Sequence, residues 1–366
     1  MPESNPLAVL RAALPRLCEA LPPTPRVDVL RALPGLSYGT PAGIRWRAEQ
    51  GFFPTHAALL AEGLQVVGAP SAAAAPDAGP LLADVPDRPE AVIVLPPRSR
   101  EEGRGLLARA VLDVAPGGRV LAAALNDEGA KSFEKDLAAL SPLAGVISKA
   151  HGRAFWTVPR PALLDPERQA LAERWLAADA PRRDAVTGLW TRPGVFNEGR
   201  LDGGSALLIA HLPKDLRGRV ADLGAGSGLL ARAVLERCPG VTALDLFEAE
   251  ARAIDLARRN LADARLPVTL HWHDVAAGVA GEGRPRFDAI VCNPPFHVGV
   301  RSVPALGRAF IAAAAQALAK DGSLLLVANR HLPYEDELRA LFGRGEALAE
   351  QGGFKVYRAW APKASG

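Results

Sequence analysis

An amide, two prolines and an aromatic ring follow one another directly after an apolar run of the sequence. The run that ends at Cys292 is typical of a short buried strand, and it is followed by Asn293, Pro294, Pro295 and Phe296. Proline cannot donate to a sheet ladder, so strand pairing must stop there. The side-chain carbonyl of Asn293 and the backbone carbonyl of Pro294 can accept hydrogen bonds from both hydrogens of an exocyclic amine, while Phe296 stacks on the ring that carries it. Because these bonds localise the nitrogen lone pair, the stretch predicts activation of a planar amine as a nucleophile.

A glycine loop, DLGAGSG, is the second stretch that could do chemistry. Gly224, Gly226 and Gly228 follow G-x-G-x-G spacing, which lets the backbone approach a ligand and turn tightly into a helix. A nicotinamide-dinucleotide loop has the spacing G-x-G-x-x-G, and its ligand there is an anionic pyrophosphate. Here Asp222 precedes the first glycine, and a carboxylate suits a cation such as an amino group or a sulfonium. The spacing and the acid disfavour a dinucleotide-dependent oxidoreductase.

Acids also stand near the ends of the next two predicted strands, VTALDLF and VTLHWHD. We expect Asp245 to accept hydrogen bonds from ribose hydroxyls and Asp274 to accept from an adenine amine, with Leu246 and Phe247 packed on the adenine. The alternative for each acid is a helix N-cap or a solvated turn. Because ligands of open α/β sheets bind at the carboxyl ends of strands, the set favours a nucleoside with a cationic tail, namely S-adenosylmethionine.

The elements that position these residues alternate between strand and helix patterns, which predicts an α/β fold with parallel sheets. The stretch EAVIVLPP at 90–97 has the layout of DAIVCNPP at 288–295, and a helix, a glycine turn and an apolar strand follow both. In the earlier copy Leu95 replaces Asn293, Arg98 replaces Phe296, and no glycine loop precedes the strand. The sequence therefore predicts an internal duplication whose first copy has lost the chemistry.

The predicted organisation is two tandem Rossmann-like domains, the N-terminal one degenerate. We expect the degenerate domain at 1–160 and the S-adenosylmethionine-binding domain at 189–366. A linker at 161–188 contains a helical pattern over 164–180, in which Trp175 packs against a domain. The Ala/Pro/Gly tract at 68–80 is typical of a surface loop.

Composition sets the remaining limits. The chain has 366 residues, 49% of them hydrophobic, so two cores can form, and its net charge of +3 is compatible with nucleic acid. Its three cysteines lack metal-ligand spacing and argue against a disulfide framework, so we expect no metal and a cytoplasmic location. His271 and His273 lack ligand partners nearby and are interpreted as packing or solvent-exposed residues. No apolar run is long enough for a membrane span, and the first residues do not resemble a signal peptide.

Together, DLGAGSG, ALDLF, HWHD and VCNPPFH resemble class I S-adenosylmethionine-dependent methyltransferases. With PGVFNEGRLDGGSALLIAHLP, VANRHLPYEDEL and GGFKVYRA, residues 193–361 are similar to the bacterial ribosomal-RNA guanine-N2 methyltransferases of the small and large subunits. The resemblance implies two tandem Rossmann-like class I methyltransferase domains, of which the degenerate one at 1–160 serves RNA recognition or support and the one at 189–366 is catalytic. It implies S-adenosylmethionine as cofactor and ribosomal RNA or a ribosomal subunit as partner. It implies catalytic roles for Asn293, Pro294 and Phe296. The cofactor-binding residues that it implies are Phe196, Asp222, Gly224, Ala225, Gly226, Gly228, Asp245, Leu246, Asp274, Val275 and Asn293.

Two other functions remain open at this point. Methyltransferases that act on a protein glutamine or an adenine amine use the same chemistry but more often carry tyrosine where Phe296 stands. An inactive RNA-binding assembly factor is disfavoured by the intact acids and Asn293. A base inside a helix cannot reach Asn293, so the target must lie in a loop or be flipped out. Candidate contacts to the RNA backbone are Arg301, Arg330, His331, Arg98, Arg100 and Arg104, and His297 is a candidate proton acceptor.

Overall fold

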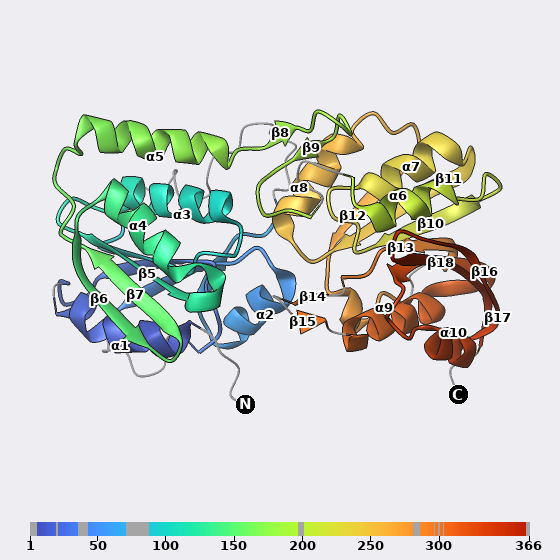
Figure 1. Ribbon diagram of the computed structural model, residues 1–366, viewed down its shortest axis with the longest axis horizontal. Coiled ribbons are helices and arrows are strands. Elements are labelled where there is room, and N and C mark those ends of the chain that lie inside the picture. The colour runs from blue at the N-terminus through green and yellow to red at the C-terminus, as the bar shows by residue number, and fades with distance from the viewer. Residues whose placement is uncertain are drawn as a thin grey trace. The chain divides into compact units, whose positions relative to one another are not determined.

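The chain folds into two compact units, each built around one sheet (Figure 1). The computed structural model describes residues 6–19, 21–35, 43–70, 88–196, 201–280, 286–295, 297–298, 301–302 and 304–363. Unit 1 comprises Met1–Pro181 with Arg192–Gly194, and unit 2 comprises Arg182–Thr191 with Val195–Gly366. The predicted loop tract falls largely outside the described residues, as does Phe296.

Unit 1 contains a seven-stranded sheet in the order β3-β2-β1-β4-β5-β7-β6. Its strands are β1 (Arg26–Leu30), β2 (Arg45–Glu49), β3 (Gln65–Val67), β4 (Ala91–Val94), β5 (Arg119–Leu125), β6 (Leu143–Lys149) and β7 (Gly152–Thr157). Its helices are α1 (Leu7–Cys18), α2 (Phe53–Ala61), α3 (Arg100–Asp113), η1 (Asn126–Glu128), α4 (Ala130–Leu140) and α5 (Pro166–Ala178). The strands β1 to β5 pair in parallel, whereas β7 runs antiparallel to both β5 and β6.

Unit 2 repeats this architecture, with a seven-stranded sheet in the order β12-β11-β10-β13-β16-β18-β17. Its sheet strands are β10 (Arg217–Leu223), β11 (Gly240–Glu248), β12 (Val268–Trp272), β13 (Phe287–Cys292), β16 (Leu318–Asn329), β17 (Phe342–Gln351) and β18 (Phe354–Pro362). Its helices are α6 (Gly203–Ala210), α7 (Leu229–Arg237), α8 (Ala251–Asn260), η2 (Val275–Ala277), α9 (Pro304–Ala317) and α10 (Glu335–Leu341). Two short hairpins pair β8 (Arg182–Arg183) with β9 (Trp190–Thr191) and β14 (His297–Val298) with β15 (Arg301–Ser302).

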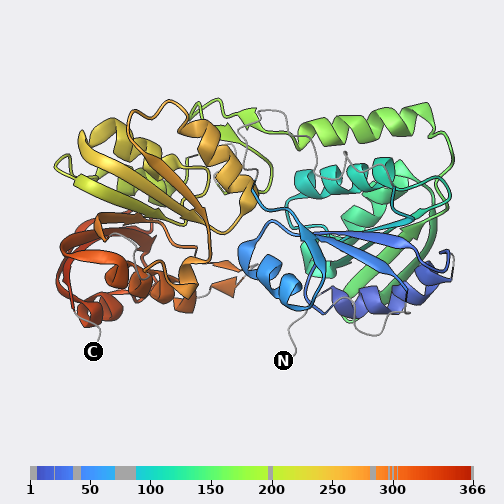
Figure 2. The ribbon, with the colours of Figure 1, turned by 180° about the vertical axis from the view of Figure 1, so that it is seen from behind.

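The sheet of unit 2 is covered on both faces. Figures 1 and 2 show α6, α7 and α8 on one face and α9 and α10 on the other. The first face buries Leu208, Val234 and Leu246 in one apolar cluster, and the second buries Phe310 and Ile311 in another. Burial on both faces explains why residues 289–292 of β13 form an unbroken apolar run instead of an alternating one.

The carboxyl ends of the parallel strands in unit 2 meet at one edge of the sheet. The strands β12, β11, β10, β13 and β16 pair in parallel, and the strand order changes direction between β10 and β13. Ligands of open α/β sheets bind at such a switch point, outside the carboxyl ends of the strands. The last strand, β18, runs antiparallel to β16.

The region expected to be a linker, residues 161–188, is shared between the two units. The helix α5 begins at Pro166 with Asp165 as its N-cap, and it packs on the apolar cluster of unit 1 through Leu171, Ala172 and Trp175. Residues from Arg182 onward group with unit 2. No helix among the described residues is long and apolar enough to cross a membrane.

Candidate functional site

The carboxyl edge of the unit 2 sheet brings together the glycine loop and the Asn-Pro-Pro turn. The loop backbone is tied to the neighbouring strand, since the N–H groups of Gly224 and Ala225 both donate to the carbonyl of Phe247, at 2.9 and 3.1 Å. Gly224 has a φ of +72°, and a Cβ there would lie 3.1 Å from Phe310 Cε1 and 3.9 Å from Pro295 Cδ. The left-handed backbone and the close approach to Phe310 of α9 therefore favour glycine at this position.

The glycine in the middle of the loop borders open space. Gly226 has a φ of +55°, and a Cβ built on it would meet no atom within 4 Å. Its N–H donates to Glu248 Oε2 at 2.8 Å. Gly228, by contrast, has a φ of +86° and would place a Cβ 3.4 Å from both Ala257 and Leu261. The first and third glycines thus serve packing, while Gly226 leaves room for a ligand.

Asp222 lies beneath the loop and is completely buried. Its Oδ2 accepts a hydrogen bond from the N–H of Ala231 at 3.0 Å, and its Oδ1 has no hydrogen-bond partner among the described residues. The pKa of Asp222 is raised from 3.8 to about 7, mainly because the carboxyl is buried; the Ala231 hydrogen bond opposes this shift and the nearby Glu248 adds to it. A cation above the loop would favour the charged form, so the site fits a ligand with a cationic group. Because Asp222 is buried, it acts on such a ligand through its field and not by contact.

Glu248, the last residue of β11, was not singled out by the sequence analysis. Its Oε1 accepts from the N–H of Glu250 at 2.8 Å, while its Oε2 holds Gly226. The side chain is partly exposed, yet its carboxyl is enclosed enough that burial raises its pKa. The strand extends three residues beyond Asp245, so Glu248 is the acid at the carboxyl edge.

Asp245, expected at the strand tip, lies inside the sheet at 2% exposure. Arg219 Nη2 lies 2.8 Å from Asp245 Oδ1, and His271 Nε2 lies 2.9 Å from the same oxygen. Burial would raise the pKa of Asp245, but its partners His271 and Arg219 hold that pKa below the usual value. The carboxylate is therefore committed to internal pairs, and the structure corrects the expectation that it faces a ribose.

The apolar residues beside Asp245 are also part of the core. Leu246 is fully buried, and Phe247 is 1% exposed and stacks on His271 with ring centroids 4.3 Å apart. Val275 is 2% exposed. The side chains of Leu246, Phe247 and Val275 are thus closed off from an adenine, contrary to the sequence expectation for Leu246 and Phe247.

The other two expected cofactor residues remain accessible. Asp274 is half-buried, and its Oδ1 accepts from the N–H of Ala276 at 2.9 Å, so it serves as the N-cap of η2. Phe196 is 53% exposed. Neither residue is brought into contact with the glycine loop by an interaction within the described chain.

Asn293 follows β13 directly, and its amide is anchored from one side. Its Nδ2 donates to Asp202 Oδ2 at 3.1 Å and to Ser205 Oγ at 2.9 Å. Pro294 is buried and Pro295 is exposed. Phe296, and the side chains of His297 and Arg301, lie outside the described part of the chain. The structure therefore places the Asn-Pro-Pro acceptors beside the glycine loop.

Comparisons with known proteins assign this arrangement to a family. The family model called methyltransferase small domain matches residues 187–358. A ribosomal RNA small subunit methyltransferase C from Pseudomonas paraeruginosa is 35% identical over 273 residues, covering 74% of this chain and 79% of that protein. One from Shewanella amazonensis is 32% identical over 272 residues, covering 73% of this chain and 76% of that protein. The chain belongs to the ribosomal RNA small subunit methyltransferase C family.

Membership in this family makes the chain a methyltransferase and confirms the resemblance drawn from its motifs. A solved structure described as the T. thermophilus 16S rRNA N2 G1207 methyltransferase (RsmC), in complex with AdoMet and guanosine, is 24% identical. The match covers 95% of this chain and 91% of the chain in that structure, with a TM-score of 0.74. The match spans both units and confirms the predicted fold of two tandem methyltransferase-like domains.

The two units of this family member can be compared position by position through their strand registers. Val27 lies opposite Ala91 in unit 1, as Val220 lies opposite Ala289 in unit 2. On this register, four site positions of unit 2 have changed in unit 1. The replacements are Val29 for Asp222, Arg31 for Gly224, Gln50 for Glu248 and Leu95 for Asn293.

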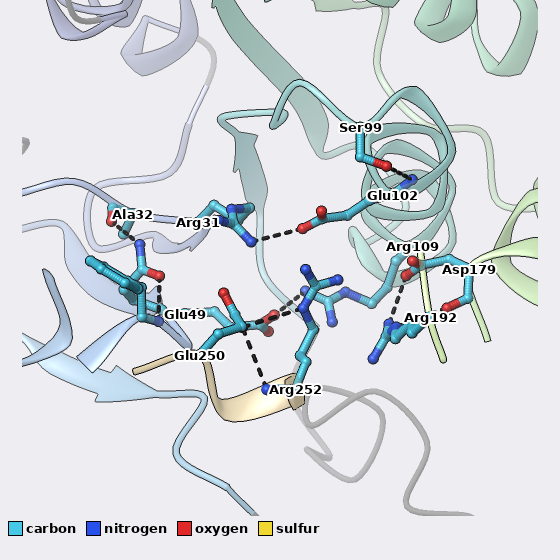
Figure 3. A network of polar contacts seen from close by, with 12 residues as sticks. Arg31, Ala32, Glu49, Ser99, Glu102, Arg109, Asp179, Arg192, Glu250 and Arg252 are labelled. Carbon is cyan, nitrogen blue, oxygen red and sulfur yellow. Dashed lines mark hydrogen bonds and ion pairs between the residues drawn. The ribbon is translucent and has the colours of Figure 1, made fainter. Parts of the chain in front are cut away.

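The replacements in unit 1 keep the shape of the loop but fill its site. Arg31 has a φ of 56°, close to the 72° of its counterpart Gly224. Its Nη1 lies 2.7 Å from Oε1 of the buried Glu102, a pair drawn in Figure 3. Gln50 Oε1 accepts from the N–H of Phe52 at 2.9 Å, the same local turn that Glu248 makes, but without charge. Unit 1 therefore carries a cationic side chain at the loop and no acid at the positions of Asp222 and Glu248.

The arginines of unit 1 that were considered for RNA contact are paired with acids of the same unit. Arg98 Nε lies 3.4 Å from Glu128. Arg100 and Arg104 both bind Asp136, at 3.0 and 2.9 Å. In unit 2, Arg330 and His331 are exposed directly after β16. The structure thus favours the exposed Arg330 and His331 over the three paired unit 1 arginines as candidate contacts to RNA.

A cavity of about 560 Å³ lies elsewhere on unit 2, against α7 and α8. Its lining includes four arginines but neither Asn293 nor Glu248. Arg183 donates to the carbonyl of Gly188, Arg237 donates to that of Ile209, and Arg232 pairs with Glu236 and Asp263. Because these cations are used within the unit, the cavity is a weaker candidate site than the carboxyl edge of the sheet.

Proposed function

We propose that the chain methylates the exocyclic N2 amine of a guanine in the ribosomal RNA of the small subunit, with S-adenosylmethionine as methyl donor. The relatives named above support the substrate, and such a substrate implies a cytoplasmic enzyme that works on ribosomal RNA or an assembling subunit. The observation that carries the proposal is the anchored Asn293 amide beside an open glycine loop.

The loop and its acids are the proposed cofactor site. Gly226 gives the space, and the backbone of Gly224, Ala225 and Gly228 shapes it. Glu248 takes the ribose role first expected of Asp245, because it is the acid at the strand end. Asp222 stabilises the cationic end through its field, and Asp274 and Phe196 bound the adenine side.

The Asn-Pro-Pro turn is proposed to prepare the nucleophile. S-adenosylmethionine supplies an electrophilic methyl group and leaves as a neutral thioether. The side-chain carbonyl of Asn293 and the backbone carbonyl of Pro294 accept the two amine hydrogens, so the nitrogen lone pair is localised before it attacks. The prolines hold both acceptors in place before the base arrives, which is electrostatic preorganisation. The proton released after transfer passes to water, and Phe296 stacks on the guanine.

The guanine must reach this turn from outside a helix. An exocyclic amine in a paired duplex is not accessible to Asn293, so the target lies in a loop or is flipped out. Arg330 and His331 follow the neighbouring strand β16 and are proposed to contact the RNA backbone there.

The proposal is tested by product analysis. The full chain is incubated with labelled S-adenosylmethionine and, separately, with small-subunit RNA, large-subunit RNA and small-subunit particles, and the RNA is digested to nucleosides for mass spectrometry. We expect N2-methylguanosine at one position of the small-subunit RNA. Label in adenine, in protein or only in large-subunit RNA would refute the assignment.

The matched control is Asn293→Ala. Removing one preorganised partner of a transition state typically lowers the rate about 10²–10³-fold. We expect that loss in single-turnover methyl transfer with cofactor and RNA saturating, while calorimetry shows nearly unchanged cofactor affinity. A rate within about threefold of the parent, roughly 0.65 kcal/mol in barrier, would mean that the amide does not activate the amine.

A further inference from the structure

The first turn of α6 holds the amide of Asn293 from the side away from its carbonyl. An asparagine amide has two N–H donors and one carbonyl acceptor. Both acceptors of the Asn293 Nδ2 group belong to this turn, Asp202 Oδ2 at 3.1 Å and Ser205 Oγ at 2.9 Å. With its two donors used there, the amide presents its Oδ1 in the opposite direction.

The two acceptors are themselves fixed. Asp202 is the N-cap of α6, and its Oδ2 accepts from the N–H of Ser205 at 2.8 Å. Ser205 is 2% exposed. Gly204 lies between them, and a Cβ there would come within 3.0 Å of Phe354 and 3.1 Å of Asp202 Oδ2. The start of α6 is therefore packed against β18 and cannot follow Asn293 if the amide turns.

A reversed amide would be costly in this setting. Rotation by 180° would place Oδ1 of Asn293 against the Asp202 carboxylate and the Ser205 hydroxyl, and both N–H groups would lose their acceptors. Leaving partly buried polar groups unpaired beside a carboxylate is strongly unfavourable. The negative charge of Asp202 also polarises the amide and makes Oδ1 a better acceptor, because hydrogen bonds in a chain strengthen one another.

We propose that Asp202 and Ser205 are positioning residues that set the orientation and the acceptor strength of the Asn293 amide. This inference rests on the proposed function, because it assigns the presented Oδ1 to the target amine. A purely structural role, capping α6 or filling its interior, is the competing explanation. The two explanations differ in one respect: positioning acts through Asn293 and disappears when Asn293 is absent.

A double-mutant cycle tests this difference in the full chain. The variants are Ser205→Ala, Asp202→Asn and Asn293→Ala, with both combinations. Alanine suits a helix, and asparagine is a good N-cap, so both single changes preserve α6. We expect Ser205→Ala and Asp202→Asn each to slow single-turnover formation of N2-methylguanosine about tenfold, or roughly 1.4 kcal/mol, with little change in cofactor affinity. In the Asn293→Ala background the same changes should alter the rate less than twofold.

The control is Asp165→Asn, which alters an N-cap of the same kind on α5 of unit 1. Asp165 Oδ1 accepts from the N–H groups of Glu167 and Arg168, both at 3.1 Å, and does not touch Asn293. It should leave the transfer rate and the cofactor affinity unchanged.

Two results would overturn the inference while leaving the proposed function intact. One is a parent-like rate for both single variants. The other is a loss of the same size with and without Asn293, which would show a structural role. If the parent protein makes no N2-methylguanosine at all, the proposed function fails, and this inference fails with it.

Discussion

At the scale of single residues, burial decides what each acid of unit 2 can do. Asp222, Asp245 and Glu248 all belong to neighbouring strands, but only Glu248 ends its strand at the glycine loop. Asp245 lies 2.7 Å from the Arg219 guanidinium and 2.9 Å from His271, whereas the Asp222 carboxylate accepts a hydrogen bond from the backbone N–H of Ala231. Two predictions separate these three roles.

The first prediction compares Glu248→Gln with Asp245→Asn. Glutamine can still accept from the N–H of Gly226, but it loses the charge that strengthens a bond to a ribose hydroxyl, which is about 1.5–3 kcal/mol for charged pairs. We expect at least roughly tenfold weaker S-adenosylmethionine binding by calorimetry for Glu248→Gln. Asp245→Asn should leave affinity within about twofold and instead lower the melting temperature, because Arg219 loses its counter-charge. The reverse pattern would return the ribose role to Asp245.

The second prediction concerns the pH dependence of stability without cofactor. Asp222 has a pKa of about 7 in the folded chain against 3.8 ordinarily, so the folded state holds a proton that the unfolded state releases. Its contribution to the free energy of unfolding is therefore complete at acid pH and is lost as the pH rises toward 7. Asp222→Asn cannot ionise. Its unfolding free energy should exceed that of the parent by an amount that grows from pH 5 to pH 8, on the order of a few kcal/mol. A difference that does not vary with pH in urea titrations would contradict the buried carboxyl.

At the scale of elements, the sequence predicted the central strands of unit 2 and left β1 and β17 unassigned. β13 and β10 were predicted from their apolar runs. β1 was missed because its centre is Asp28, which is buried between Arg26 and Arg47 at 2.8 and 2.9 Å. β17 was missed because it is a mostly exposed edge strand. Ion pairs between strands and exposure at an edge are tertiary facts that periodicity does not contain.

The residues of the proposed site could be predicted from the sequence about as far as the strands could. Local motifs gave the glycine loop and Asn293, because the chemistry there depends on consecutive residues. The motifs did not give Glu248, since the end of β11 is fixed by its pairing with β10 and β12. The contacts of Asn293 with Asp202 and Ser205 join residues far apart in the sequence, and only the packing of α6 brings them together.

The third prediction contrasts two glycines of one loop. In Gly226→Ala the added methyl group projects into open space where the ligand is proposed to lie, so we expect at least tenfold weaker cofactor binding. The added methyl group of Gly228→Ala meets Ala257 and Leu261 at 3.4 Å, so we expect mainly a loss of stability. Both variants also pay about 1–2 kcal/mol for a left-handed backbone, which makes them a matched pair. Equal loss of affinity in the two, by calorimetry on folded protein, would argue that Gly226 is only structural.

At the scale of the whole molecule, the described residues contain the same sheet order twice, and the proposed site lies in unit 2. Unit 1 keeps the strand order and the left-handed turn, at Arg31, while it has no acid at the positions of Asp222 and Glu248. A partly buried Arg31–Glu102 pair takes the place of an open loop. The Arg31 side chain at this position is thus paired with an acid of unit 1 itself. This pairing favours a supporting or RNA-recognising role for unit 1 over a second catalytic role.

The fourth prediction is therefore that the full chain binds one S-adenosylmethionine. Equilibrium binding should give a stoichiometry of one S-adenosylmethionine per chain. Glu248→Gln should weaken binding at that site, and no second binding site should become detectable. Arg31→Gly makes the stricter test, because it restores glycine at the left-handed position and removes the internal cation. We still expect one site, since Val29, Gln50 and Leu95 leave unit 1 without the acids and the amide. A stoichiometry of two in the parent would contradict the degenerate unit, and a second event in Arg31→Gly alone would mean that one side chain, and not the loss of the acids, closes that site.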